Sequence, residues 1–550
     1  METIELLKII LSLILILFIP GLLWSYVFFK DKLDAIERLV LGSGLSIALV
    51  TLMILYLNRY LGIKVTFFNS IFAVLIICAI AVGILWKNKE PRIHEIYSSV
   101  LSKRINVNIS KNSIMLILII LLASYFNYIP HSNYDYPVHR DEWEHLTASK
   151  ALIKAENTIY PNPRLGPEYK LDDLEIGFRL WISEILLTGI SEWFVFKYLN
   201  ILIACFTVLS VYIFADRFGY GLHAAFFTAL IPTSVRLLGP GFLVPVSLAV
   251  GFIALAFFIA FRNHGSRYIP LFLIFLFLLY AHPPTALVLF IIFMPYIIAY
   301  REWKLAAVMI IANIFALPQF LVMFTKRGLE AMQFPSSAFF DSLFIEYGYL
   351  PTIFCIIGTS FIHKRGEKDR FLVYGTFILL FLNYFYRNSG WSIFYPERNY
   401  FYIFILMSII AGYGIAKLKD KRAIAVMVLL ILFISYNAHI KMPYYYIIDD
   451  REFNDFVWIK NNLEGTTIID PWKAIAFTAV AEKYVYSYVG AGPHKILDPR
   501  NREVYEFFRK NCSDIEFLKN NNLSIIYSGG KCDAPELKKV KDNIYYLEKG

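Results

Sequence analysis

Long apolar runs separated by short polar segments make up the chain from its start to about residue 440. The first four are Ile4–Phe29, Leu39–Leu57, Phe67–Trp86 and Ile114–Ile129. A helix that crosses the hydrocarbon core of a bilayer needs roughly 20 mostly apolar residues, because its backbone polar groups must bond within the segment. The first run lacks a basic start and a small-residue cleavage site, so it is predicted to be a retained span.

Further runs of the same kind follow: Trp193–Ala215, Gly221–Leu238, Gly241–Phe261, Tyr268–Ala281, Thr285–Ala299, Leu305–Phe324, Ser342–Ile362, Phe371–Tyr386, Tyr400–Ala416 and Ile424–Ile440. Together the runs predict about fourteen transmembrane helices in an all-α membrane domain. The two runs that flank His282-Pro283-Pro284 are short, so they are predicted to form one broken helix pair.

Basic residues gather in alternate loops, which is the pattern of cytoplasmic loops in membrane proteins. All of these loops can lie in the cytoplasm only if Ile176–Ile190 does not cross the membrane. That stretch is short, carries Arg179 and Glu184, and has Phe178 and Ile185 on one helical face. It is therefore predicted to be an amphipathic helix at the membrane interface. Both termini and the loop 131–175 then face outward.

The composition supports this interpretation, since the 550 residues are 58% hydrophobic and only 17% charged. A soluble protein of this length needs more polar surface. The net charge of +10 arises mostly from the short loops, so it indicates membrane orientation and no nucleic-acid partner. The sequence has no phosphate-binding Gly-x-x-x-x-Gly-Lys loop, Cys-x-x-Cys pair or nucleophile elbow, which argues against ATP-driven transport and hydrolase chemistry.

The tail from Lys441 to Gly550 is charged, and short strand-like runs alternate in it with helix-like runs. The strand-like runs are Thr466–Ile469, Tyr484–Tyr488, Ser524–Tyr527 and Asn543–Leu547. It is predicted to be a compact extracytoplasmic α/β domain. Cys512 and Cys532 could pair there if the exterior is oxidising. The chain thus divides into an N-terminal module of three spans with a basic linker (1–111), a transmembrane domain that includes the loop 131–175 (112–440), and the tail domain (441–550).

The most informative polar segment is His139-Arg140-Asp141-Glu142-Trp143-Glu144-His145, just beyond the fourth span. Adjacent acids beside His and Arg could hold a divalent ion or deprotonate a hydroxyl. The structural alternative is a solvated helix start in which Asp141 caps the helix and Glu142 with Glu144 faces its positive end. The spacing alone favours neither.

Other candidates lie at the predicted outer ends of spans. Arg236 and Arg398 could each bind a phosphate through two N–H groups, or could reach the interface as structural residues. His282 lies at the proline break, where a structural role is also common. Lys326 and Arg327 form an outward basic pair that an anionic lipid or substrate headgroup would explain.

Several of these motifs occur in a particular order. The Asp141-Glu142 pair is followed by Leu174–Gly189, which ends in Leu-Thr-Gly, by Tyr212–Gly219, by Pro232–Arg236, by the His282-Pro283 break, and by Arg398 with Ala411–Gly414. Val457–Asn461 and Asp470–Trp472 follow in the tail domain. In this order the chain, from about Asn112 onward, resembles the GT-C superfamily of membrane glycosyltransferases. The three spans before that resemble an N-terminal membrane module of archaeal and bacterial proteins whose role is unknown.

The resemblance implies an inverting transfer of a sugar from a polyprenyl phosphate or diphosphate to a protein, lipid or glycan acceptor in the cell envelope. Asp141 would be the base or acceptor-orienting acid with Glu142 beside it, with or without Mg²⁺ or Mn²⁺. Arg236 and Arg398 would bind the donor phosphate, and His139, His145, His282, Lys326 and Arg327 would contact substrate. The Trp-Trp-Asp-x-Gly motif of the oligosaccharyltransferase branch does not occur here, which favours a mannosyl- or aminoarabinosyl-transferase-like enzyme.

Two other classes of function remain open. A transporter or flippase for an anionic lipid-linked substrate would place ionisable residues deep within its spans. A non-catalytic membrane assembly protein would keep the fold without the chemistry. The ionisable candidates of this sequence crowd at the outer ends of spans, which favours the transferase. The sugar and the acceptor are not specified by the sequence.

Overall fold

The computed structural model describes residues 3–30, 32–87, 110–234, 237–262, 265–327, 346–365, 369–389, 396–444, 446–489 and 498–548. The chain separates into two compact units. Unit 1 comprises Met1–Asp135 and Leu174–Pro443, and unit 2 comprises Tyr136–Asp173 and Tyr444–Gly550. Within the loop 131–175, which was predicted to belong to the transmembrane domain, Tyr136–Asp173 therefore group with the C-terminal residues.

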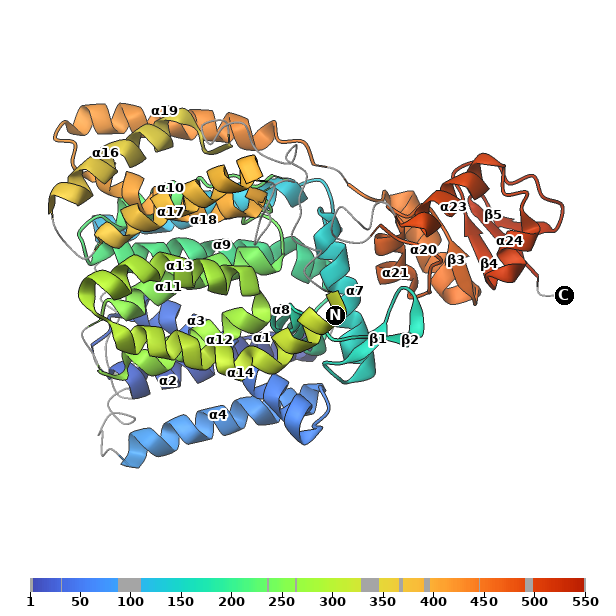
Figure 1. Ribbon diagram of the computed structural model, residues 1–550, viewed down its shortest axis with the longest axis horizontal. Helices are drawn as coiled ribbons and strands as arrows, with labels where there is room; N and C mark the ends of the chain where they lie inside the picture. The colour runs from blue at the N-terminus through green and yellow to red at the C-terminus, as the bar shows by residue number, and fades with distance from the viewer. Residues whose placement is uncertain are drawn as a thin grey trace. The chain divides into compact units, whose positions relative to one another are not determined.

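Unit 1 is helical, and Figure 1 shows its long helices lying side by side. Its elements are α1 (Thr3–Leu17), α2 (Ile19–Phe29), α3 (Ala35–Leu61), α4 (Phe67–Lys87), α6 (Lys111–Tyr128), η1 (Ile129–His131), α8 (Ile176–Leu187), α9 (Glu192–Asp216), α10 (Gly221–Ala229), α11 (Pro245–Ala260), η2 (Gly265–Arg267), α12 (Tyr268–Ala281), α13 (Pro283–Tyr300), α14 (Trp303–Arg327), α16 (Tyr349–Arg365), α17 (Arg370–Ser389), α18 (Pro396–Ala416) and α19 (Lys421–Ile440).

Nine helices among the described residues are long and apolar enough to cross a membrane. Three shorter apolar helices, Pro245–Ala260, Gly265–Ala281 and Arg370–Tyr386, accompany them. These helices support the prediction of a multi-pass membrane protein. The predicted total of about fourteen spans stays a prediction.

Glycines allow several of these helices to approach closely. A Cβ atom at Gly21 of α2 would lie 1.9 Å from the carbonyl oxygen of Gly42 in α3, and one at Gly414 of α18 would lie 2.2 Å from the carbonyl oxygen of Phe354 in α16. Small residues at helix contacts are a common means of packing in membranes, because backbones can then touch. The pairs α2–α3 and α16–α18 are therefore held at backbone contact.

Helix α8 differs from its prediction. Its twelve residues are too few to span a bilayer, and it is not among the candidate spans. However, every residue from Ile176 to Ile185 is buried, Arg179 and Glu184 included, so the expected exposed polar face is wrong. The helix is enclosed by packing against α3, α9 and α12, which covers its polar side as well as its apolar side.

The predicted break at His282 is confirmed. Helix α12 ends at Ala281 and α13 begins at Pro283, with His282 alone between them in a non-helical conformation. Pro283 and Pro284 have no backbone N–H to continue the hydrogen bonds of α12, whereas they fit the first turn of a new helix. The two prolines therefore stop one helix and start the next.

Unit 2 contains a four-stranded mixed sheet of order β3-β4-β6-β5. Its strands are β3 (Thr466–Ile468), β4 (Leu523–Tyr527), β5 (Leu537–Lys541) and β6 (Ile544–Leu547). Strand β3 pairs in parallel with β4, and the other two pairs are antiparallel. The α/β prediction is confirmed in kind, but β5 was missed, and the predicted strand Tyr484–Tyr488 contributes a single bridge, from Val485 to Thr467.

The helices of unit 2 are α7 (Arg140–Ala155), α20 (Asp450–Asn462), α21 (Ala474–Ala481), α23 (Pro499–Arg509) and α24 (Ile515–Asn520), and β1 (Tyr160–Asn162) forms a hairpin with β2 (Gly166–Leu171). Helix α7 packs on α21, where Lys150 donates to the carbonyl of Ala479 at 2.9 Å. Cys512 and Cys532 form a disulfide, while Cys78, Cys205 and Cys355 are free. Cys512 is fully buried in the core beside the sheet.

We expect Cys512→Ser to lower the free energy of unfolding of unit 2 by about 3 kcal/mol, because the bond closes a loop of moderate length in the unfolded chain. The measurement is the denaturant midpoint for proteolysis of unit 2 in the detergent-purified full chain. Cys78→Ser in α4 is the matched control, since Cys78 forms no disulfide. A midpoint that Cys512→Ser and reductant both leave unchanged would contradict the expectation.

Candidate functional site

Four polar side chains meet inside unit 1 where α12 gives way to α13 (the His282 cluster: Glu175, His282, Thr285 and Tyr402). His282 Nδ1 lies 2.7 Å from Thr285 Oγ1, which lies 2.9 Å from the Tyr402 hydroxyl. The Tyr402 hydroxyl is also 3.4 Å from His282 Nδ1. On the other side of the ring, His282 Nε2 is 3.7 Å from a carboxylate oxygen of Glu175. The cluster therefore links a carboxylate, an imidazole and two hydroxyls.

The cluster is buried apart from one end. His282, Thr285 and Tyr402 are each at most 1% exposed, whereas the Glu175 side chain is 24% exposed. Polar groups removed from water cost free energy unless they bond to one another, and His282 Nδ1, Thr285 and Tyr402 do. An imidazole between a carboxylate and two hydroxyls is an arrangement that can relay a proton.

Arg398 adds a positive charge to this region. It lies in the first turn of α18, one helical turn before Tyr402, so both side chains project from the same side of the helix. Arg398 and Glu175 both interact electrostatically with the Tyr402 hydroxyl. Arg398 and His282, which were predicted separately, are thus brought together in the structure.

Three other predicted residues cannot be placed in this way. Arg236 lies outside the described residues. The backbone of α14 continues through Lys326 and Arg327, but their side chains also lie outside the described part of the chain. Their predicted contacts with the donor phosphate or substrate stay predictions.

The first turn of α7 in unit 2 holds the other predicted residues, and it is built differently from the expectation. His139 is the N-cap, and its Nδ1 accepts a hydrogen bond of 3.0 Å from the backbone N–H of Asp141. The prediction that Asp141 caps the helix is therefore wrong. The helix begins two residues earlier than expected because Glu142, three positions after His139, completes the cap from the other side.

Glu142 has a structural role in this cap. It is fully buried, and one carboxylate oxygen accepts hydrogen bonds from the backbone N–H groups of Val138 at 2.8 Å and His139 at 2.9 Å. Asp141 is only partly buried and faces the charge of Arg140. The two adjacent acids therefore differ in environment, and Asp141 is the better placed of the two to meet a substrate.

Arg140 connects this turn to the rest of unit 2. Its guanidinium donates to the carbonyl of Val489 and lies 5.6 Å from the ring centroid of Trp472. Burial lowers the pKa of Arg140, and the charge of Asp141 opposes that shift. His145, one turn further along α7, is buried on the inner side of the helix, which favours a structural role for it.

A divalent cation held by Asp141 and Glu142 together does not fit these residues, because the Glu142 carboxylate is buried and bonded to the backbone. Across the described residues, no three His, Cys, Asp or Glu side chains come close enough to form a metal site. The predicted cation gains no support from this geometry, and no step below passes through a metal.

The sequence analysis did not single out Glu175, Thr285 or Tyr402 as site residues. Two helical spacings could have indicated the last two, since Thr285 follows His282 by three residues and Tyr402 follows Arg398 by four. The proximity of Glu175 to His282 depends on how α8 packs against α12, which no local pattern specifies.

Comparisons with known proteins add the following. Residues 2–109 match a family described as "Domain of unknown function (DUF8471)". No curated protein matches the chain. The solved structures to which the chain is similar include the Archaeoglobus fulgidus oligosaccharyltransferase in its apo form (12% identity, 76% of this chain, 70% of that chain, TM-score 0.46). The archaeal oligosaccharyltransferase AglB from the same organism, in complex with an inhibitory peptide and a dolichol-phosphate, is also similar (13% identity, 75% and 69%, TM-score 0.44).

The same oligosaccharyltransferase in complex with zinc and sulfate gives 12% identity over 75% of this chain and 67% of that chain, with a TM-score of 0.44. TM-scores of 0.44 to 0.46 are too low to establish a shared fold. The prediction of a mannosyl- or aminoarabinosyl-type enzyme gains no support from these comparisons, and it stays a prediction.

We expect Glu142→Ala to lower the free energy of unfolding of unit 2 by about 1–3 kcal/mol, because it leaves two backbone donors without their acceptor. Glu142→Gln keeps an acceptor oxygen at the same place and should recover most of that loss. Asp141→Asn, which leaves the His139 and Glu142 cap in place, is the control and should change the unfolding midpoint little. Equal midpoints for Glu142→Ala and wild type would remove the structural role assigned to Glu142.

Proposed function

We propose that the chain is a membrane glycosyltransferase that moves a sugar from a polyprenyl phosphate or diphosphate to an acceptor on the outer face of the membrane. The observation that carries the proposal is the His282 cluster beside Arg398: a buried acid–base relay one helical turn from a guanidinium. The order of motifs from Asp141 to Asp470 supports the same reaction class.

The proposed chemistry follows from the leaving group of the sugar donor, which is a phosphate. The bond between the anomeric carbon and the phosphate oxygen breaks, and the phosphate departs with the electron pair and gains negative charge. A guanidinium can stabilise that charge through paired N–H groups. Arg398 is proposed for this role, with Arg236 as a second phosphate ligand. The Glu175–His282 pair is proposed to hold a proton and to supply it to the departing phosphate.

On the acceptor, a hydroxyl or amide forms the new bond to the anomeric carbon from the opposite face and gives up its proton. Asp141 is proposed to take that proton or to orient the acceptor, since its carboxylate is partly exposed while that of Glu142 is bonded to the backbone. Attack from the opposite face makes the transfer inverting. His139, which caps α7, positions Asp141.

The location on the outer face rests on two arguments. The alternate basic loops favour a cytoplasmic location for the span ends that carry them, and the count of predicted spans then puts the residues after α19 on the outside. The Cys512–Cys532 disulfide suits an oxidising exterior, because cytoplasmic thiols are kept reduced. The proposed protein is therefore a multi-pass protein of the cell membrane with unit 2 on the outside.

One observation favours a transporter as a second candidate function. The Glu184 carboxyl of α8 is fully buried in unit 1, and neither of its oxygens has a hydrogen-bond partner among the described residues. An isolated carboxylate is very costly in an apolar interior, so the group is expected to be protonated at rest. Buried acids of this kind occur in proton-coupled transporters.

We expect Asp141→Asn to lower the rate of sugar transfer about 10²-fold or more, because the amide cannot take a proton. The measurement is transfer from a lipid-linked sugar by the full chain in vesicles, with cell-envelope extract as the source of donor and acceptor. Arg398→Met should lower the rate by about 10²–10³-fold, and Arg398→Lys by less, because lysine keeps the charge without the paired N–H groups.

The matched controls are Asp542→Asn and Arg422→Met, since both residues are exposed and have no place in the proposed chemistry. Both controls should keep wild-type rates. If Asp141→Asn and Arg398→Met also transfer sugar at the wild-type rate, the site assignment fails. If the wild-type chain transfers no sugar while transport of a lipid-linked anion depends on it, the transporter becomes the better proposal.

Glu184→Gln separates the two candidate functions. A transferase should tolerate this change with less than about a threefold loss of rate, because glutamine resembles the protonated carboxyl in shape and hydrogen bonding. A proton-coupled transporter should lose its dependence on a pH gradient. The two readouts are initial transfer rate and gradient-driven uptake into vesicles, measured on the same preparation.

A further inference from the structure

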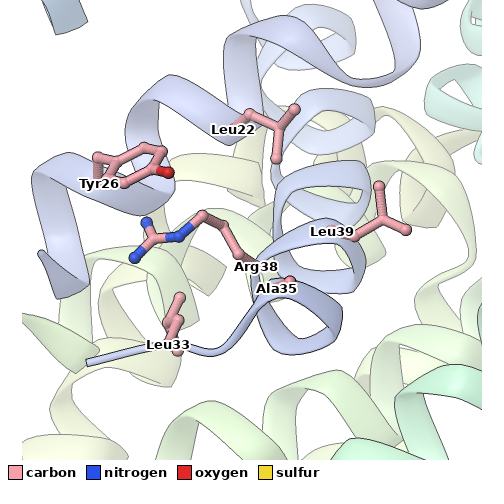
Figure 2. A pocket seen from close by; sticks show the side chains of 6 residues that line it. All are labelled: Leu22, Tyr26, Leu33, Ala35, Arg38 and Leu39. Atoms are coloured by element: carbon pink, nitrogen blue, oxygen red, sulfur yellow. The ribbon is translucent and has the colours of Figure 1, made fainter. Parts of the chain in front are cut away.

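A pocket lies between the C-terminal end of α2 and the N-terminal end of α3, within the residues that match the family of unknown function. It is lined by Leu22, Tyr26, Leu33, Ala35, Arg38 and Leu39, as Figure 2 shows, and has a volume of about 430 Å³. A pocket of this size suits a small molecule or a lipid headgroup. None of its lining residues belongs to the His282 cluster.

Arg38 supplies the charge of this pocket. Its side chain extends from α3 toward Tyr26 of α2 in Figure 2, and its guanidinium carbon lies 3.5 Å from the centroid of the Tyr26 ring. It donates to the Ser25 hydroxyl at 3.3 Å and to the Lys30 carbonyl. All of these partners are uncharged side chains or backbone, so the guanidinium is held in a fixed position with its charge uncompensated by them.

The acids near Arg38 are bound to other groups. Glu37 pairs with Arg262 and lies 3.9 Å from Arg217. Asp34 is the N-cap of α3 and accepts from the backbone N–H of Glu37 at 2.8 Å. Among the residues that the structure describes, no carboxylate forms an ion pair with Arg38. The charge of Glu37 acts on the Arg38 guanidinium without forming an ion pair with it, so an anion that enters the pocket could still bind the guanidinium directly.

The walls of the pocket indicate a particular kind of anion. Leu22 and Leu39 lie on candidate membrane spans, and Leu39 is 45% exposed. A ligand that satisfies both the guanidinium and these leucines carries a phosphate and a hydrocarbon chain together. Inorganic phosphate would use only the charged half of the pocket.

We propose that this pocket binds the headgroup of an acidic phospholipid, with the phosphate on Arg38 and an acyl chain along Leu22 and Leu39. The site lies where two spans end, which is the depth of the headgroups, and basic pockets between spans on the cytoplasmic side are known to hold anionic lipids. The proposal concerns the N-terminal module alone and does not depend on the transferase reaction.

The test is native mass spectrometry of the detergent-purified full chain titrated with phosphatidylglycerol or phosphatidylcholine. The wild type should bind one phosphatidylglycerol about tenfold more tightly than phosphatidylcholine, the factor that one charge-assisted contact provides. Arg38→Met should remove that preference. Arg422→Met is the matched control, because Arg422 is an exposed arginine in the first turn of another candidate span, and it should keep the preference.

Ala35→Trp tests the pocket without touching the guanidinium. Ala35 is an exposed lining residue, so the large ring should fill the cavity while the contacts of Arg38 remain, and binding should weaken as it does in Arg38→Met. Equal retention of both lipids by the wild type, or an unchanged preference in either variant, overturns the proposal. Displacement of phosphatidylglycerol by millimolar inorganic phosphate would also overturn it, because the site would then take the anion without the lipid.

Discussion

The cost of placing polar groups in an apolar interior is the constraint on which the rest of this structure depends. Within a bundle of apolar helices, each buried donor, acceptor or charge must find a partner or become neutral. His282 meets this requirement at Nδ1 through Thr285 and Tyr402, and its Nε2 lies 3.7 Å from a carboxylate oxygen of Glu175. Glu142 meets it in unit 2 by accepting two backbone N–H groups. The candidate chemistry of the chain lies where the bonds among these groups still leave a charge that can bind a ligand or a proton that can be transferred.

Glu184 is an exception to the requirement that a buried polar group have a partner. Its burial is a consequence of how α8 packs against α3 and α12, and within the described part of the chain neither carboxylate oxygen accepts a hydrogen bond. Protonation removes the charge at a much smaller cost than burial of a carboxylate would require. The burial of Glu184 therefore argues against a surface position for α8. Its protonated carboxyl is also the observation that supports a proton-coupled transporter as the second candidate function.

Much of the architecture could be predicted from local patterns, since the apolar runs, the His282-Pro283-Pro284 break and the alternation of strands and helices in the tail all depend on neighbouring residues. The cap of α7 was mispredicted at Asp141 because histidine is an unusual N-cap residue, and the side-chain acceptor is a ring nitrogen. The polar face of α8 and the position of Glu175 could not be predicted, because both depend on contacts between segments far apart in the chain. The grouping of Tyr136–Asp173 with the C-terminal residues has the same origin.

The candidate residues of unit 1 share one structural feature, which is that they lie where helices begin or end. His282 separates α12 from α13, Arg398 opens α18, and Arg38 lies in the first turn of α3. Within a helix the backbone groups are already bonded to each other, whereas at its ends they are available to side chains and ligands. Arg38 uses this directly when it donates to the carbonyl of Lys30, just beyond the end of α2. Helix ends are also the places where a long cationic side chain can reach the polar edge of a membrane, so a chain with few charged residues gathers its binding chemistry there.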